Sequence, residues 1–547
     1  MEKRDFVPEI ILINGDIRTQ DTKHPIASAV AVSQNRILAV GKNEEIRSLT
    51  KKDTKVVDLH GRLCLPGMMD SHFHYYDWAL GRRELALADV KSFQELLDRV
   101  SSATEKVEPG TWILGQGWNE SDWPGHRMPI RDDLDRIAPF NPVALWRCDL
   151  HLAVVNSAAL ELAHIDEDTP DPPAGVIARD ASGRPNGILR ELATGLIKDI
   201  IPAPGEDDLL VAMRNGIHFL HSIGLTGLED IRLMGGKEGA PAFRAWQRLR
   251  DAGELDLRCW VSIPGERLDE AVSLGLRTGF GDDRLRIGHL KFFIDGGMGA
   301  RTAWMLEPYL DAGYGMSLTS MEELKASLCR ADQAGLAVVI HSIGDRANHE
   351  IVSVFESIIN ARTDPEKVAP AVPMAAHRIE HLQMVRPDDM ARLGQLGVVA
   401  CVQPHNMILD IAMIDECVGP KGKWTYPYRD MLDYGIRVIF SSDAPVCNPN
   451  PLVGIYSAVT RQRKDGTPDG GWYPSQRISV EEAVKGYTIL PAVSYGVDDK
   501  LGSITPGKYA DMVVLDKNIY TIDPMEIIET KVDITIFDGR IVFQREQ

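Results

Sequence analysis

The sequence lacks the features that organise small secreted or membrane-bound proteins. Its seven cysteines stand singly at positions 64, 148, 259, 329, 401, 417 and 447. Without a C-x-x-C pair, this spacing supports neither a disulfide framework nor a thiolate zinc site. No run approaches the roughly 18 apolar residues of a membrane span, and the first residues contain no apolar signal-peptide core. We therefore expect a cytoplasmic protein that does not enter a membrane.

Positive charge is also scarce, because 60 Lys and Arg residues stand against 79 Asp and Glu residues, a formal net charge of −19. No cluster of basic residues occurs, which argues against a nucleic-acid partner. The glycine-rich stretch 295–299 matches neither G-x-x-x-x-G-K-[ST] nor G-x-G-x-x-G, so we do not interpret it as a phosphate-binding loop. The expected partner is a small-molecule substrate, and association into a homo-oligomer is left open.

What is present is length and a regular alternation of patterns. The 547 residues exceed the roughly 250–300 at which a single core stops growing. Both ends of the chain hold short β-type runs divided by Gly, Asn and Asp turns. We predict that residues 1–65 and 500–547 form one small β-rich domain; the alternative is two independent β caps.

The middle of the chain, residues 66–499, alternates helix-length amphipathic stretches with short apolar strands. Seven such pairs follow residue 205, and an eighth strand, RLCLPGMMDSH, precedes them near residue 62. This α/β pattern predicts a (β/α)8 TIM barrel. The span from His72 to Asp443 is longer than a bare barrel of about 250 residues, so we predict an inserted subdomain at about 105–200, after the first strand, which could act as a lid.

Possible metal ligands stand where the predicted strands end, at the reactive face of such a barrel. The first strand ends in D-S-H-F-H, whose period of two places His72 and His74 on one side. Each of the other candidates alone has an ordinary structural explanation. Together they predict a site for a zinc-like divalent ion. The other strand-end candidates are Lys291, His341, His381 and Asp443.

Several longer segments resemble the metal-dependent amidohydrolase superfamily, amidohydrolase family 3, and within it the branch of the N-substituted formamide deformylases. The matching segments are LPGMMDSHFH, GQGWNESDWP, RCDLHLAVVNSAAL, GILRELA, KFFIDGGMGARTA, HSIGDRAN, HRIEHLQ, SSDAPV and GSITPGKYADMVVLD. The resemblance runs over nearly the whole chain. It implies that the two termini form a composite β-sandwich beside the barrel.

The resemblance also implies a ligand set for one or two Zn²⁺ ions. His72 and His74 would bind the first metal with Asp443, and His341 and His381 would bind the second. Lys291, carboxylated by CO₂ to a carbamate, would bridge the two. The alternative for Lys291 is an ion pair with Asp295. Without the bridge, one metal on His72, His74 and Asp443 would suffice.

The implied activity is hydrolysis of a non-peptide C–N bond, in an N-substituted formamide or a similar small amide. A metal would activate water, and Asp443 would act as general acid and base. Asp70, Glu380 and Asp345 are the candidates nearest in sequence to orient the ligand imidazoles. A deaminase or a cyclic-amide, carbamate or ester hydrolase on the same scaffold is the alternative, and a catalytically silent binding protein is a remote one.

Substrate contacts are predicted from polar and aromatic residues outside the ligand set. Polar groups close together after a strand-like run are costly to bury without partners, which favours a functional role for the segment around residue 149. The alternatives are core packing for the tryptophan and loop hydrogen bonding for the glutamine. The predicted substrate-binding residues are Trp118, Arg147, Asp149, His151 and Gln403.

Overall fold

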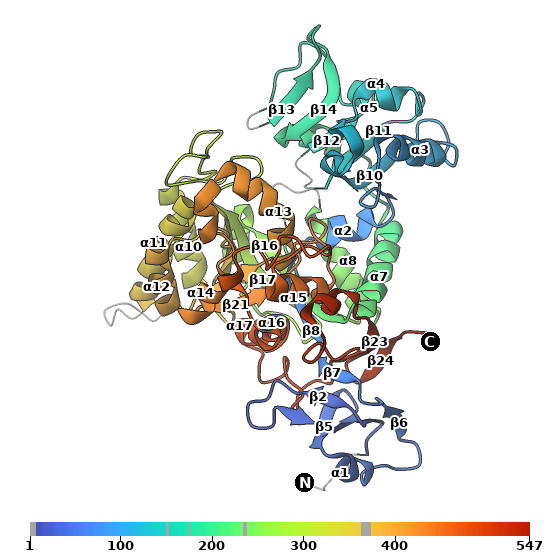
Figure 1. Cartoon of the computed structure of the whole chain (residues 1–547), viewed down its shortest axis with the longest axis vertical. Helices are drawn as coiled ribbons and strands as arrows, with labels where there is room; N and C mark the ends of the chain where they lie inside the picture. The colour runs from blue at the N-terminus through green and yellow to red at the C-terminus, as the bar shows by residue number, and fades with distance from the viewer. Residues whose placement is uncertain (1–6, 149–151, 173–174, 233–237, 363–372, 547) are drawn as a thin grey trace. The chain divides into compact units, whose positions relative to one another are not determined.

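The protein is described by a computed structural model over residues 7–148, 152–172, 175–232, 238–362 and 373–546. These residues form two compact units. The first is built on an eight-stranded parallel sheet (Figure 1). Its strands are β8 (Met68–Phe73), β15 (Leu225–Asp230), β16 (Arg258–Pro264), β17 (Leu285–Phe293), β18 (Val338–Ser342), β19 (Arg378–His381), β20 (Val399–Val402) and β21 (Arg437–Phe440).

The sheet closes where its first and last strands meet, because Phe73 and Ala444 form a parallel bridge. The predicted (β/α)8 barrel is confirmed. Strands such as β20, with the sequence VACV, are buried along their whole length, as expected for a sheet covered on both faces. The helices that accompany the strands in chain order are α7 (Glu206–Ser222), α8 (Gly239–Asp251), α9 (Leu268–Ser273), α10 (Met321–Gln333), α11 (Asp345–Arg362), α12 (Pro387–Leu396), α13 (Pro404–Cys417), α14 (Tyr428–Asp433), α15 (Pro451–Thr460), α16 (Val480–Tyr487) and α17 (Ile489–Ser494).

The two ends of the chain pair with each other in the same unit. One sheet has the order β5-β4-β1-β6, and the other, β24-β23-β22-β7-β2-β3, joins strands from both termini. Their apolar faces share one core cluster, as in a β-sandwich. The strands are β1 (Ile10–Ile13), β2 (Asp16–Arg18), β3 (Ile26–Ala27), β4 (Ala29–Ser33), β5 (Arg36–Gly41), β6 (Lys55–Asp58), β7 (Leu63–Pro66), β22 (Met512–Leu515), β23 (Val532–Phe537) and β24 (Arg540–Gln544), with the short helix α1 (Asn43–Arg47).

The run predicted as one strand near residue 62 is divided between the sandwich and the barrel. β7 pairs with β2 and β22, whereas β8 pairs with β15. The division falls at Gly67, where a Cβ atom would lie 2.3 Å from Thr226 Oγ1. Glycine therefore allows the close approach at which the chain leaves one sheet for the other.

The second unit, most of it Tyr76–Gly216, contains a six-stranded mixed sheet of order β13-β14-β12-β11-β10-β9. The insertion predicted at 105–200 falls inside it, and its function as a lid stays a prediction. The strands are β9 (Leu85–Ala86), β10 (Ile113–Trp118), β11 (Val143–Arg147), β12 (Leu152–Val155), β13 (Gly175–Arg179) and β14 (Pro185–Glu191). The helices of this unit are α2 (Tyr75–Gly81), α3 (Phe93–Thr104), α4 (Arg131–Asp135), α5 (Ser157–Leu162) and α6 (Gly195–Lys198).

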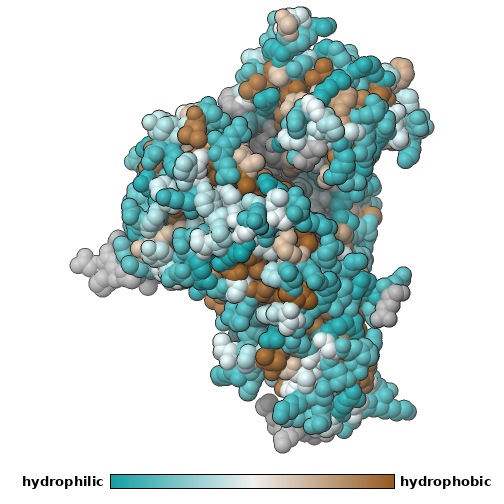
Figure 2. Space-filling view, in the orientation of Figure 1, coloured by the Kyte–Doolittle hydropathy of each residue, from teal (hydrophilic) through white to brown (hydrophobic). Residues whose placement is uncertain are grey.

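Polar residues dominate the face of the molecule in Figure 2, with hydrophobic ones in small scattered groups. Among the described residues, no helix combines the length and hydropathy needed to cross a membrane.

Candidate metal centre

The ends of β8 and β21 are tied together by backbone hydrogen bonds beside the predicted ligands. The Asp443 N–H donates to His72 O at 2.9 Å, and the His74 N–H donates to Ala444 O at 2.8 Å. These bonds place the ligands of the first and last strands at one point of the barrel rim. The register of the barrel likewise pairs Ser342, next to His341, with His381.

Three of the predicted ligands form one compact donor group. Ligand atoms of His72, His381 and Asp443 all lie within 4.8 Å of one another, and all three residues are buried. The ring of His72 lies 5.2 Å from that of His74 and 5.4 Å from that of His381. The ring of His341 lies 4.4 Å from that of His381. The four predicted imidazoles therefore form one continuous series across β8, β18 and β19.

One ring nitrogen of each imidazole faces an acceptor oxygen. An N–H on that nitrogen leaves the lone pair, which a metal requires, on the other. The pairs are His72 Nδ1 with Glu380 Oε2, His74 Nδ1 with Ile231 O at 2.7 Å, His381 Nδ1 with Gln403 Oε1 at 2.9 Å, and His341 Nε2 with Gly296 O at 3.5 Å.

Burial favours the neutral imidazoles of His341 and His381, whereas neighbouring histidines favour the ionised form of Asp443. Burial, together with His381, lowers the pKa of His341 well below its ordinary value, and burial lowers the pKa of His381 to about 4. Burial alone would raise the pKa of Asp443, but His72 and His74 hold it well below the ordinary value. Neutral imidazole and ionised carboxylate are the forms that bind divalent metals.

The carboxylate of Asp443 provides a direct test of whether these residues fit a cation. Its Oδ1 lies 2.9 Å from His74 Nε2 and 3.3 Å from His72 Nε2. Within the described chain, no donor satisfies hydrogen-bond geometry with this buried oxygen. A cation could be shared by this oxygen and the two ring nitrogens, so the donor set fits a metal.

Lys291 lies on β17 and is only 1% exposed. Burial lowers its pKa to about 8. The alternative ion pair with Asp295 is not formed, because Asp295 accepts the backbone N–H groups of Trp304, Ile343 and Gly344 at 2.8–3.0 Å. Lys291 Nζ instead lies 4.6 Å from the centre of the Phe293 ring.

Of the three carboxylates predicted to orient ligand imidazoles, Glu380 contacts His72. Asp70 accepts the backbone N–H groups of His72 and Ser442, so it shapes the loop rather than a ring. Asp345 accepts the backbone N–H of Leu306.

Gln403, predicted to bind substrate, contacts His381, one of the predicted metal ligands, and a substrate contact by Gln403 stays a prediction. Its side chain is 1% exposed; its Oε1 faces His381 Nδ1, and its Nε2 donates to Ser441 Oγ at 2.9 Å. The peptide carbonyls of Ile231 and Gly296 were not anticipated as acceptors. No side-chain signal in the sequence marks such a carbonyl.

Two further predicted substrate contacts belong to the second unit. Trp118 is fully buried there, and its indole N–H donates to Leu145 O at 3.0 Å. Arg147 forms a bidentate pair with Glu120 at 2.9 and 3.2 Å. Asp149 and His151 lie outside the described residues. A substrate contact by any of these four stays a prediction.

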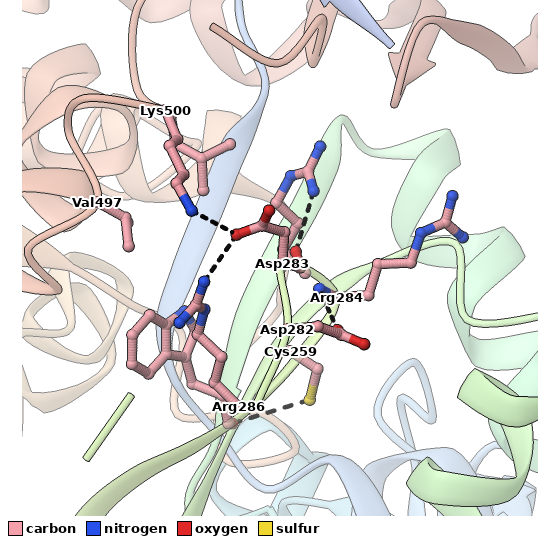
Figure 3. A pocket seen from close by; sticks show the side chains of 10 residues that line it. Cys259, Asp282, Asp283, Arg284, Arg286, Val497 and Lys500 are labelled. Carbon is pink, nitrogen blue, oxygen red and sulfur yellow. Dashed lines mark hydrogen bonds and ion pairs between the residues drawn. The ribbon is translucent and has the colours of Figure 1, made fainter. Parts of the chain in front are cut away.

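A pocket at the opposite ends of the strands is not a second candidate site. It lies where β16 and β17 begin, and its volume of about 10 Å³ holds roughly one water molecule. Figure 3 shows Lys500 and Arg286 both directed at Asp283, with distances of 3.0 and 2.7 Å. The charged groups that line it are paired, so it serves as a structural junction.

Comparison with known proteins agrees with this geometry. The sequence profile of the amidohydrolase family matches residues 55–543. The chain belongs to the amidohydrolase family. This amidohydrolase is 33% identical to Protein LONG AFTER FAR-RED 3 of Arabidopsis thaliana, over 94% of the chain and 88% of that protein. It is 28% identical to an N-substituted formamide deformylase of Arthrobacter pascens, over 98% of both chains.

Among solved structures, the amidohydrolase resembles an uncharacterized metal-dependent hydrolase from Pyrococcus horikoshii. The TM-score is 0.76 at 27% identity, covering 94% of this chain and 99% of the other. The amidohydrolase thus has the fold of a metal-dependent hydrolase, and its buried group of His72, His381 and Asp443 lies at the carboxyl ends of the barrel strands. In barrels of this kind that face carries the chemistry.

Proposed function

We propose that this amidohydrolase hydrolyses the non-peptide C–N bond of an N-substituted formamide or a similar small amide. The observation that carries the proposal is the buried donor group at the strand ends, in which the ring nitrogens and Asp443 Oδ1 converge. The likeness to an N-substituted formamide deformylase supports the substrate class.

His72, His74 and Asp443 would hold one divalent ion, with Zn²⁺ the expected species, and His341 and His381 a second. Such an ion lowers the pKa of a bound water and polarises the substrate carbonyl. The side chains Glu380 and Gln403 keep His72 and His381 in the tautomer whose second nitrogen bears the lone pair.

Asp443 is the group proposed to move the proton. Its Oδ1 faces the ring nitrogens of His72 and His74, so Oδ2 would accept the proton from water and pass it to the departing amine. The lowered pKa of this carboxyl keeps it ionised before each cycle.

Lys291 would complete the two-metal arrangement as a carbamate. Its neutral amine would attack CO₂: an N–C bond forms as one C=O π bond of CO₂ opens, and the amine loses a proton, leaving a carbamate whose single negative charge is shared by two oxygens. Burial favours the reactive form, because it lowers the pKa of the amine to about 8. The carbamate would then supply two oxygen donors to the metals of the site.

Removal and replacement of the metal tests the proposal. The protein is stripped with a chelator and assayed for amine release from N-substituted formamides, other amides, cyclic amides, carbamates and esters, with ammonia release for deamination. Hydrolysis of formamides should disappear and return with added Zn²⁺. Full activity in metal-free protein refutes the proposal, whereas turnover of another class alone reassigns the substrate.

A paired substitution tests the ligands themselves. The double variant His72→Ala with His74→Ala should lose bound metal and turnover together. Its control is His24→Ala with His60→Ala, which removes two exposed imidazoles of the sandwich and should leave both unchanged. Retention of metal by the first pair would contradict the assignment.

A further inference from the structure

Behind the predicted ligand His72 lies a buried polar network, of which the proposed chemistry uses only Glu380. It joins Glu229 of β15, His289 of β17, Arg378 and Glu380 of β19, and Tyr495, which follows α17. Each of these five side chains is at most 1% exposed. The network therefore crosses the buried interior of the barrel and connects the residue that follows α17 with the candidate metal centre.

Arg378 is the central member, with three hydrogen bonds and two further ion-pair contacts. Nε and Nη2 each lie 2.9 Å from Glu380 Oε1. Nη1 donates to Tyr495 Oη at 2.7 Å and lies 2.8 Å from Glu229 Oε2. Nη2 also donates to the carbonyl of Ser71 at 2.8 Å. A planar guanidinium with a hydrogen bond at each of its three nitrogens is fixed in orientation.

Two of these contacts lead directly to the ligand. Glu380 contacts Arg378 through Oε1 and His72 Nδ1 through Oε2. The Arg378 guanidinium therefore orients the Glu380 carboxylate, and this carboxylate orients the imidazole of His72. Ser71 immediately precedes His72, so the same guanidinium also holds the peptide from which the ligand projects.

The remote end of the network is closed by Tyr495. Its hydroxyl donates to Glu229 Oε2 at 2.7 Å while accepting from Arg378. Glu229 Oε1 in turn faces Nδ1 of His289 at 2.8 Å, and Nε2 of that imidazole lies 3.1 Å from Ala376 O. The carboxylates of Glu229 and Glu380 thus face the guanidinium of Arg378. The imidazole of His289 has an acceptor oxygen near each of its two nitrogens.

Stability alone does not account for such an arrangement. Replacing a buried Arg–Glu system by apolar residues is often neutral or stabilising, whereas a fully satisfied network specifies one geometry. The geometry specified here is that of Glu380 against His72.

We propose that Arg378 and Tyr495 are positioning residues of the metal centre, which act through Glu380 to hold His72 in its metal-binding orientation. The inference rests on the metal centre of the proposed function. It assigns part of the metal affinity to a hydroxyl three contacts away from the ligand.

The test uses the full-length chain and measures Zn²⁺ affinity by competition with a chelator. Tyr495→Phe removes only the hydroxyl and keeps the ring, and Arg378→Lys keeps the charge but not the five donors. Each should weaken Zn²⁺ binding by about 10-fold, the lower end of what orienting partners of metal ligands contribute. The visible spectrum of the Co²⁺-loaded variants should shift, because the ligand geometry changes.

Tyr428→Phe is the matched control, since its hydroxyl is also buried but has no hydrogen-bond partner in the described chain. It should retain wild-type affinity and spectrum. Wild-type Zn²⁺ affinity in folded Tyr495→Phe and Arg378→Lys overturns the proposal. So does an equal loss in Tyr428→Phe, or a loss of thermal stability with unchanged metal binding.

The two proposals fail differently. If the wild-type chain binds Zn²⁺ but cleaves no amide, the proposed function fails. The Zn²⁺ affinities of the variants relative to wild type then still decide whether Arg378 and Tyr495 position His72. If the wild-type chain binds no divalent ion, both fail.

Discussion

The firmest quantitative prediction concerns Arg258, which joins the barrel to the sandwich. At the start of β16 it is 4% exposed and forms a bidentate pair with Asp511, at 2.5 and 3.0 Å. Its Nη2 also donates to Asp538 at 3.2 Å, and its guanidinium stacks on Tyr509 at 4.0 Å. Asp511 and Asp538 flank β22 and β23, so this one side chain secures the sheet made from both termini.

Arg258→Met keeps the apolar stem and leaves Asp511 buried without its cation. Removing one partner of a buried pair costs about 3–5 kcal/mol. Since about 1.4 kcal/mol is a factor of ten, opening of this junction should become roughly a hundred-fold to a few thousand-fold more frequent. Hydrogen exchange measures this directly, because amides of β22 and β23 exchange through such local opening.

Two comparisons separate the charge effect from simple loss of packing. Adding Asp511→Asn to Arg258→Met removes the unpaired charge and should recover a large part of the protection. Arg250→Met breaks an exposed pair with Asp282 and should leave exchange in β22 unchanged. The reasoning is refuted if Arg258→Met exchanges like wild type, or if the double variant is no better than the single one.

Three further predictions follow from the same structure. Burial alone would raise the pKa of Asp538, but Arg284 and Arg258 outweigh burial and hold this pKa below its ordinary value. A carboxyl whose pKa is lowered in the folded state stabilises the fold above its unfolded pKa, and this contribution is lost as the pH falls through its folded pKa. Thermal stability should therefore decline below about pH 4, and a flat profile from pH 7 to pH 3 contradicts this. Gly67→Ala should destabilise the fold by about 1–3 kcal/mol through overlap with Thr226, and Thr226→Ala should partly restore it in a thermal melt; no rescue argues against the overlap. Lys291→Ala should lower the metal content from two ions to one per chain, measured by elemental analysis with native mass spectrometry; two retained ions would exclude the bridge.

The meeting of candidate ligands from the first and last strands can be predicted from the sequence, because it depends on two simple regularities. Alternation along an extended strand places His72 and His74 on one side, and the closure of a parallel barrel brings the end of its last strand, with Asp443, back to its first. Neither regularity requires knowledge of side-chain packing. The meeting of His72 with Asp443 follows from them, whereas the position of His381 in the donor group does not.

The residues that contact the candidate ligands could not be predicted from the sequence in this way. Glu380 was one of three carboxylates near in sequence, and only the fold distinguishes it from Asp70 and Asp345. Tyr495 lies outside the strands, so its contact with Arg378 depends on how α17 packs under the barrel. The division of one apolar run at Gly67 likewise depends on the approach of Thr226 from another strand.

Backbone conformation at the site explains why strand periodicity alone would misplace a ligand. Strict alternation along β19 would turn Glu380 and His381 to opposite faces. His381 instead has φ of +69° and Asp443 has φ of +59°, a left-handed conformation that non-glycine residues rarely adopt. Such positions cost about 1–3 kcal/mol and persist only where surrounding contacts determine them. Here Gln403 holds the ring of His381, and the His72 carbonyl holds the N–H of Asp443. The geometry of the candidate metal centre is therefore imposed by contacts between strands and not by periodicity along one strand.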